Sequence, residues 1–437
     1  MANRITSVDA LINSSLLIKD WRTGLPRLKC SEKVAREIYA LLGLLLRQFV
    51  RSWHSEIIDD SKFVNELVQE ISQVVNLIID RLQRLNLDDL ILDDIPYLID
   101  MHLIDYRQSL QKLQKLGLSS ESIQSTYPSL EYHNVDEQLY LTVLSRGMTS
   151  IVLSTEELNS PCARAFVTSI MKDIVLQNIM KVSEPWMIYD ILLKLLMTLQ
   201  PAKKVQTIPA KEKTSNYSSS VSSQISEYYH KTITIISSLV ASTGRLLGTS
   251  ASFLATYEKR SEKPTPFVAR AIFPLLSHIL ELELRNPLLA STIHVAGMPF
   301  RRGKLGAIST EFISTTLYNK VHDEQTVIKC LATIRTVLFP NGYLGPGRPV
   351  PSEKEQIETK KCLVMTIKDL LPEQFKYLFV GPDVALQIEE ILDIFNEQFA
   401  NKQLLLKLLD LIMCNLFPEL SLHNPEDIRL LKMHDNS

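Results

Sequence analysis

Four aspartates between residues 88 and 94 have the residue type and spacing best suited to chemistry in this chain: Asp88, Asp89, Asp93 and Asp94. Carboxylates four or five positions apart on one helix can share Mg²⁺ and so bind a diphosphate, as in all-α prenyl-chain enzymes. Such a site needs a second acidic cluster facing the first, and none is evident in the sequence. The simpler interpretation is that these acids, with Asn86, cap helices and occupy their first turns. We therefore predict no metal site.

The common catalytic patterns are missing from the rest of the sequence. The nine histidines include no H-E-x-x-H motif, and His102 is best explained as a packed residue one helical turn before Tyr106. The glycines near residue 345 precede Arg348-Pro349 rather than Gly-Lys-Ser/Thr, and no G-x-S-x-G motif occurs. The five cysteines are scattered without a C-x-x-C pair, which fits a reducing compartment. We predict no catalytic residue, no cofactor and no enzyme activity.

Composition and charge narrow the class of partner. The chain has 437 residues, is 45% hydrophobic and 22% charged, and carries a net charge of −2, so it is a folded protein without the strong positive charge of a general nucleic-acid binder. Asp9 interrupts the stretch that a signal peptide would need, and Arg47, Lys407 and Asp410 interrupt the longest apolar runs. We expect a cytoplasmic protein that is not secreted, has no transmembrane helix and meets membranes only peripherally.

The elements that must position any site are predicted to be helices. Residues 401–420 are leucine-rich, and Gln403, Lys407 and Asp410 form one narrow polar stripe, so this helix must be enclosed by other helices or by an apolar ligand. Pro418 ends it. The same helical period, with few strand patterns, recurs through the first half, so we predict an all-α fold. The other helices expected there are Val34–Val50, Phe63–Leu85, Ile95–Leu116, Val135–Leu153, Ala163–Met180 and Trp186–Leu199.

Two segments suggest contact with a membrane. Between Lys231 and Glu258 the only charge is Arg245, and bulky apolar residues alternate with Ser, Thr, Gly and Ala, as in a helix that inserts into the membrane interface. The alternative is a core helix that connects two domains. A basic cluster follows at Arg301, Arg302 and Lys304, which would bind anionic headgroups or form an ordinary solvated loop. The predicted lipid-contacting residues of the first segment are Ile233, Ile236, Leu239, Val240, Leu247, Phe253 and Leu254.

Two ordered sets of short motifs span most of the chain. The first is Phe49-Val50-Arg51-Ser52-Trp53, Ser61, Phe63, Leu67, His102, Tyr106, Glu137, Tyr140-Leu141 and Val182-Ser183-Glu184-Pro185-Trp186. The second is Leu338-Phe339-Pro340-Asn341-Gly342, Leu371-Pro372, Val380-Gly381, Asn401-Lys402, Leu408-Leu409-Asp410 and Leu416-Phe417-Pro418-Glu419-Leu420. The first set resembles a PXA (PX-associated) domain, and the second resembles the sorting-nexin C-terminal domain. The chain is similar to a short form of that family, without its transmembrane, RGS and PX domains.

The resemblance implies a function and a domain plan. Members of that family tether the endoplasmic reticulum to endosomes, the vacuole or lipid droplets, and their two domains are thought to dock around a hydrophobic, lipid-accepting cavity. We expect domains of this kind at 1–200 (PXA-like) and 267–420 (nexin-C-like), with a Lys/Ser-rich linker at 201–225, the apolar segment at 226–258 and a polar tail at 421–437.

The function expected from the resemblance is non-enzymatic. The protein would bind or transfer lipid at organelle contact sites in endosomal or vacuolar trafficking. Because the chain lacks the family's own membrane helices and PX domain, its expected partners are lipid surfaces and a longer, membrane-anchored PXA-family protein. The competing hypothesis is a protein–protein scaffold or adaptor of the sorting-nexin family that carries no lipid.

Overall fold

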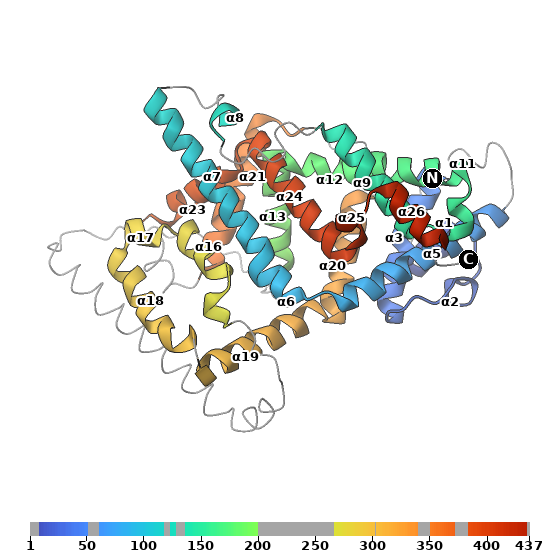
Figure 1. Cartoon of the computed structure of the whole chain (residues 1–437), viewed down its shortest axis with the longest axis horizontal. Coiled ribbons are helices and arrows are strands. Elements are labelled where there is room, and N and C mark those ends of the chain that lie inside the picture. The colour runs from blue at the N-terminus through green and yellow to red at the C-terminus, as the bar shows by residue number, and fades with distance from the viewer. Residues whose placement is uncertain are drawn as a thin grey trace, which may run out of the picture. The chain divides into compact units, whose positions relative to one another are not determined.

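The computed structural model describes residues 8–50, 61–117, 123–127, 136–199, 266–301, 303–339, 350–371 and 383–434. All regular elements among these residues are helices, which confirms the all-α prediction (Figure 1). The helices predicted from periodicity in the first half are confirmed as well. They are α3 (Glu32–Phe49), α5 (Ser61–Arg84), α7 (Ile95–Leu116), α9 (Glu137–Val152), the continuous run of α11 (Pro161–Ser169), η3 (Ile170–Leu176) and α12 (Gln177–Met180), and α13 (Pro185–Leu199).

Helices continue through the second half of the chain, and shorter helical pieces connect the long helices of the first half. In the first half they are α1 (Val8–Leu16), α2 (Trp21–Gly24), α6 (Leu87–Asp89), η1 (Leu90–Asp94), α8 (Ile123–Thr126), α10 (Thr155–Leu158) and η4 (Lys181–Ser183). The second half holds η5 (Phe267–Ala269), α16 (Ile272–Ile279), α17 (Leu282–Arg285), α18 (Pro287–Arg301), α19 (Gly303–Val321), α20 (Glu324–Leu338), α21 (Glu353–Leu370), α23 (Val384–Leu392), η7 (Asp393–Phe395), α24 (Gln398–Leu416), α25 (Glu419–Leu422) and α26 (Pro425–His434).

The chain folds into two compact units that do not follow each other in sequence. The first unit combines Met1–Met187 with Ser314–Lys354 and Glu397–Ser437, and the second combines Ile188–Ile313 with Glu355–Asn396. The sequential domain plan stays a prediction, and its linker at 201–225 and apolar segment at 226–258 lie outside the described residues. Within the first unit, helices from both ends of the sequence share hydrophobic clusters.

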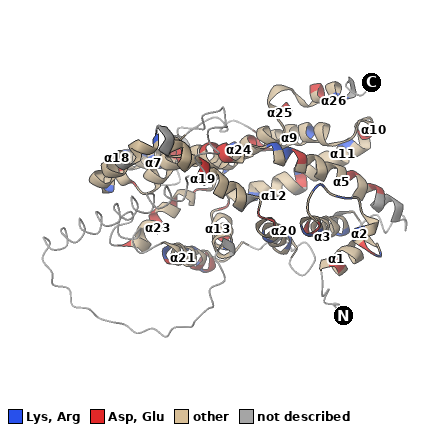
Figure 2. Ribbon diagram, turned by 90° about the horizontal axis from the view of Figure 1, so that it is seen from below, with Lys and Arg blue, Asp and Glu red and all other residues tan. Residues whose placement is uncertain are grey.

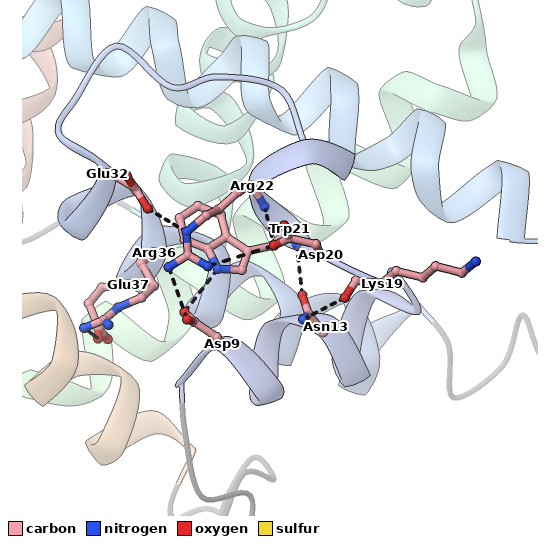
Figure 3. A network of polar contacts seen from close by, with 9 residues as sticks. All are labelled: Asp9, Asn13, Lys19, Asp20, Trp21, Arg22, Glu32, Arg36 and Glu37. Atoms are coloured by element: carbon pink, nitrogen blue, oxygen red, sulfur yellow. Dashed lines mark hydrogen bonds and ion pairs between the residues drawn. The ribbon is translucent and has the colours of Figure 1, made fainter.

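A polar network fastens the N-terminal helices of the first unit to α3. The Arg22 guanidinium donates to Glu32 at 2.6 Å and to Asp9 at 3.2 Å, and the Trp21 indole N–H donates to Asp9 at 3.1 Å (Figure 3). The Trp21 ring is itself buried, 6.1 Å from the ring of Tyr39. Residues 8–30 are therefore an integral part of this unit.

Helix α24 is enclosed by other helices of the first unit, as its broad apolar circumference predicts. Its Leu406 and Leu409 are buried with Leu141 of α9 and Leu176 of η3. The polar stripe is not exposed along its whole length, because Gln403 is buried. A helical period identifies a stripe but not what lies opposite it, and neighbouring helices cover this one on its polar side as well.

Polar bonds join α24 to the helices of the first half. Asp410 accepts a hydrogen bond from the Tyr140 hydroxyl at 2.5 Å, and the Lys402 ammonium lies 2.6 Å from Glu137 at the start of α9. The buried Asn401 amide donates to the carbonyl of Ser183 at 3.1 Å. These bonds specify one register of α24 against α9 and η4, because shifting the helix would leave buried polar groups unsatisfied.

Residues 421–437, which the domain plan treats as a polar tail, include helix α26, which packs on α9. The Asn424 side chain accepts from the backbone N–H groups of Glu426 and Asp427, which caps the helix, and Ile428 is buried in the shared core. Lys432 donates to the carbonyl oxygens of Ile151 and Leu153 at the end of α9. Burial lowers the pKa of this ammonium, although its position at a helix C-terminus is favourable for a cation.

The contact between Arg81 and Glu419 should make the first unit sensitive to acid. The Arg81 guanidinium, bound to both carboxylate oxygens at 2.7 and 2.9 Å, lowers the pKa of Glu419. A carboxyl whose pKa is lower in the folded state adds stability above its unfolded pKa and loses it as pH falls through the folded value. We expect the melting temperature of Glu419→Gln, followed by tryptophan fluorescence, to fall less between pH 7 and pH 3 than that of the parent. An equal fall in both proteins would contradict this.

Candidate membrane-binding surface

Helix α18 of the second unit presents an apolar face to solvent. Leu288, Val295 and Met298 are 67%, 60% and 53% exposed, and their spacing of seven and three residues places them on one side of the helix. Leu284 of the preceding helix α17 is also exposed. Exposed leucines are common singly, but several along one helix face mark an interaction surface.

The polar side chains beside these residues are already satisfied within the helix. Ser291 donates its hydroxyl to the carbonyl of Pro287 at 2.8 Å, and Thr292 donates to the carbonyl of Leu288 at 2.7 Å. A hydroxyl bonded back to its own helix loses little when water is removed from around it. The outward face of α18 is therefore less costly to bury in an apolar medium than its composition indicates.

The only formal charge on α18 is positive and lies at its C-terminal end. Arg301, one of the predicted headgroup residues, is exposed there, and its guanidinium lies 3.2 Å from Nδ1 of His294 on the same helix. Figure 2 colours the positions of basic residues blue and those of acidic residues red along the ribbon. Arg302 lies outside the described residues. Lys304 lies in the first turn of α19, but its side chain is not among those that the structure describes. The helix has no acidic residue.

The opposite face of α18 is anchored in the second unit. Leu289 is buried and packs with Leu282 of α17. Gly297 allows η5 to approach, because a Cβ at this position would lie 3.2 Å from Val268. In turn, the buried Thr310 of α19 accepts from the backbone N–H of Phe267 at 2.7 Å and so ties η5 to α19. The apolar face is thus presented by a packed helix.

The turn from α18 to α19 depends on Gly306. A Cβ at this position would lie 2.5 Å from the carbonyl oxygen of Phe300, which is backbone and cannot rotate away. We expect Gly306→Ala to destabilise this turn by about 1–3 kcal/mol, since the overpacking outweighs the gain in helix propensity. Amide hydrogen exchange of the peptides that cover α18 and α19 should become faster.

A matched substitution on the same helix pair tests this reason. Gly297→Ala would meet only a methyl group of Val268, a partly exposed side chain that must shift by a few tenths of an ångström, so exchange in the same peptides should change much less than in Gly306→Ala. Equally faster exchange in both variants would show that loss of any glycine here, rather than the contact with Phe300, is what matters.

The other residues singled out from the sequence have different outcomes. The seven predicted lipid-contacting residues between Ile233 and Leu254 lie outside the described residues. The cap interpretation is confirmed for Asn86, whose side chain accepts from the N–H of Asp89 at 3.4 Å. Burial, with the neighbouring Asp89 and Asp93, raises the pKa of Asp94. In the part of the chain that the structure describes, no group of His, Cys, Asp and Glu side chains is arranged to hold a metal ion.

None of the helices in the described ranges is both long and apolar enough to cross a membrane.

Residues 31–195 match the family model of the PXA domain. The chain therefore contains a PXA domain. The match begins at Ser31, which caps α3 with a hydrogen bond from the N–H of Val34, and ends within α13. It covers most of the N-terminal part of the first unit, whereas α18, α20, α24 and α26 lie beyond it.

Curated relatives cover only part of the chain. Human sorting nexin-25 is 28% identical over 103 residues, which are 24% of this chain and 12% of that protein, and mouse sorting nexin-25 matches to the same extent. The chain thus matches about an eighth of the length of these relatives. No solved structure matches it. The resemblance of the second half to the sorting-nexin C-terminal domain stays a prediction.

Proposed function

We propose that this protein is a non-enzymatic peripheral membrane protein that binds or transfers lipid in endosomal or vacuolar trafficking, at contacts with the endoplasmic reticulum. The PXA domain and the similarity to sorting nexin-25 support a role in trafficking. The observation that carries the lipid part of the proposal is the exposed, acid-free apolar face of α18. Its partners would be lipid surfaces and a longer, membrane-anchored PXA-family protein.

A scaffold without lipid cargo is the second candidate, and one observation favours it. Helix α24, whose apolar residues cover most of its circumference, is covered by protein: Leu404, Leu406 and Leu409 are buried, and the neighbours come from α9, η3 and the C-terminal helices. This part of the first unit needs no ligand to fill it. A lipid-accepting cavity must therefore involve other surfaces.

A transfer assay separates the two candidates. Donor liposomes carrying a fluorescent phospholipid with a quencher are mixed with acceptor liposomes, and the full-length protein is added at substoichiometric amounts. A carrier should raise fluorescence at a rate proportional to protein concentration. A scaffold should leave the rate at its spontaneous value, even if it gathers the liposomes together, which light scattering would report.

The non-enzymatic part of the proposal has its own test. If the aspartates around residue 90 served a divalent metal, turnover of a prenyl diphosphate would require Mg²⁺ and would be lost in Asp89→Asn and Asp93→Asn. We expect no metal-dependent turnover in the parent protein, and both variants should behave like it in the transfer assay. Magnesium-dependent release of diphosphate by the parent would overturn this part of the proposal.

A further inference from the structure

We propose that the outward face of α18, with the basic residue Arg301 at its C-terminal end, docks this protein on bilayers that contain anionic lipids. The inference rests on the proposed function, because it names the lipid surface to which a peripheral carrier would bind. It concerns a surface outside the segment that matches the PXA domain.

The outward face suits shallow insertion. Leu288, Val295 and Met298 are more than half exposed, and the neighbouring hydroxyls of Ser291 and Thr292 are bonded to their own helix. A helix of fifteen residues is about 22 Å long, so it would lie along the interface rather than cross it. Burial of apolar side chains at the boundary between headgroups and acyl chains is what holds such helices.

The charges near α18 are arranged to favour an anionic surface. The acids on the neighbouring segment, Glu281 and Glu283, precede the N-terminal end of α18, and Glu281 is engaged by Arg285 at 2.8 Å. The opposite end carries Arg301, and the sequence continues with Arg302 and Lys304. Each basic residue at an anionic bilayer raises affinity about fivefold, so Arg301, with the two basic residues that follow it closely in the sequence, should matter.

A bilayer fits this face better than a protein partner does. Protein interfaces combine an apolar centre with hydrogen bonds that fix register, whereas the hydroxyls on this face of α18 are used within the helix. A fluid bilayer requires no fixed register. The other occupants to be tested are a protein, a second copy of this chain and its own segment Thr232–Tyr257.

Vesicle flotation of the full-length protein tests the proposal. The probes are vesicles of phosphatidylcholine alone and vesicles containing 30 mol% phosphatidylserine as well. We expect binding to the anionic vesicles that weakens as salt is raised. It should fall about tenfold or more in the triple variant Leu288→Ser, Val295→Ser, Met298→Ser, and by a similar factor in Arg301→Gln, Arg302→Gln, Lys304→Gln.

A matched control removes equally exposed apolar residues from the same unit. Ile357, Met365 and Leu386 are 49%, 57% and 52% exposed on α21 and α23. The variant Ile357→Ser, Met365→Ser, Leu386→Ser should bind vesicles like the parent. If it loses as much binding as the α18 variant, general apolar exposure rather than α18 is responsible, and the proposal fails.

A second readout reports insertion directly and does not depend on loss of binding. The three tryptophans, Trp21, Trp53 and Trp186, all belong to the first unit, so Val295→Trp introduces the first indole into the second unit. Vesicles with brominated acyl chains should quench the added fluorescence of Val295→Trp but not that of Ile357→Trp. Absence of quenching at residue 295 in vesicle-bound protein would overturn the proposal and point to Thr232–Tyr257.

The two proposals fail in different ways. If the protein carries lipid but its α18 variants bind vesicles like the parent, the docking surface is wrong and the carrier function stands. If α18 docks on anionic vesicles but no lipid co-purifies or is transferred, the carrier function is wrong and docking stands. Binding of no vesicle by the parent protein overturns the docking proposal outright.

Discussion

Replacement of Leu406 by alanine is expected to lower the free energy of unfolding of the first unit by about 2–5 kcal/mol. Leu406 is 3% exposed and lies in the cluster that α24 forms with α9 and η3. The loss combines the transfer of a buried side chain with the cavity left behind, which packed neighbours close only in part. Because Trp21 and Trp186 are buried in this unit, denaturant unfolding followed by tryptophan fluorescence measures it.

Ile412 provides the control on the same helix. It is 37% exposed, so Ile412→Ala should cost much less, about 1 kcal/mol or below. Equal losses in Leu406→Ala and Ile412→Ala would contradict this account, because the cost would then not follow the burial of the side chain, and alanine itself favours the helix.

Removal of Arg335 is expected to cost about 3 kcal/mol, because it leaves the carboxylate of Glu37 buried without its main partner. The Arg335 guanidinium of α20 donates to Glu37 of α3 at 3.0 Å, and only 4% of the Glu37 side chain is exposed. Arg36 lies further away, at 3.9 Å, and would compensate only in part. The free energies of unfolding of Arg335→Met and of the parent protein are compared by denaturant unfolding, followed by tryptophan fluorescence.

Two further variants test the reason. Lys33 and Glu324 join the same two helices at 3.4 Å, but both are exposed, so Lys33→Met should change stability by less than about 1 kcal/mol. The double variant Glu37→Met, Arg335→Met should recover most of the stability lost in Arg335→Met, since it removes the buried charge as well. A double variant as unstable as the single one would contradict a charge-based account.

Local periodicity was sufficient to predict the helices but not their surroundings. The repeating apolar positions of α3, α7 and α24 predict where these helices lie, because that pattern depends only on neighbours three and four residues away. The pairing of Glu37 with Arg335 joins residues 298 positions apart and leaves no local signal. For the same reason the sequence did not show that Gln403 is buried.

The candidate surface was only partly predictable. The basic cluster at Arg301 was visible as a charge pattern, but the outward face of α18 was missed, since Gly297, Pro299 and the hydroxyl residues interrupt its apolar run. Which side of a helix lacks protein neighbours is a tertiary property. Helix α26, in contrast, had a readable signal: Asn424-Pro425-Glu426 is a typical helix start.

The central claim is that this protein binds lipid, and native mass spectrometry tests it most directly. The full-length protein would be purified from cells without detergent, and its mass compared before and after lipid extraction. We predict a stoichiometric glycerophospholipid or neutral lipid in the native protein. A mass equal to that of the polypeptide alone, together with no uptake from liposomes, would contradict the account and leave a helical adaptor.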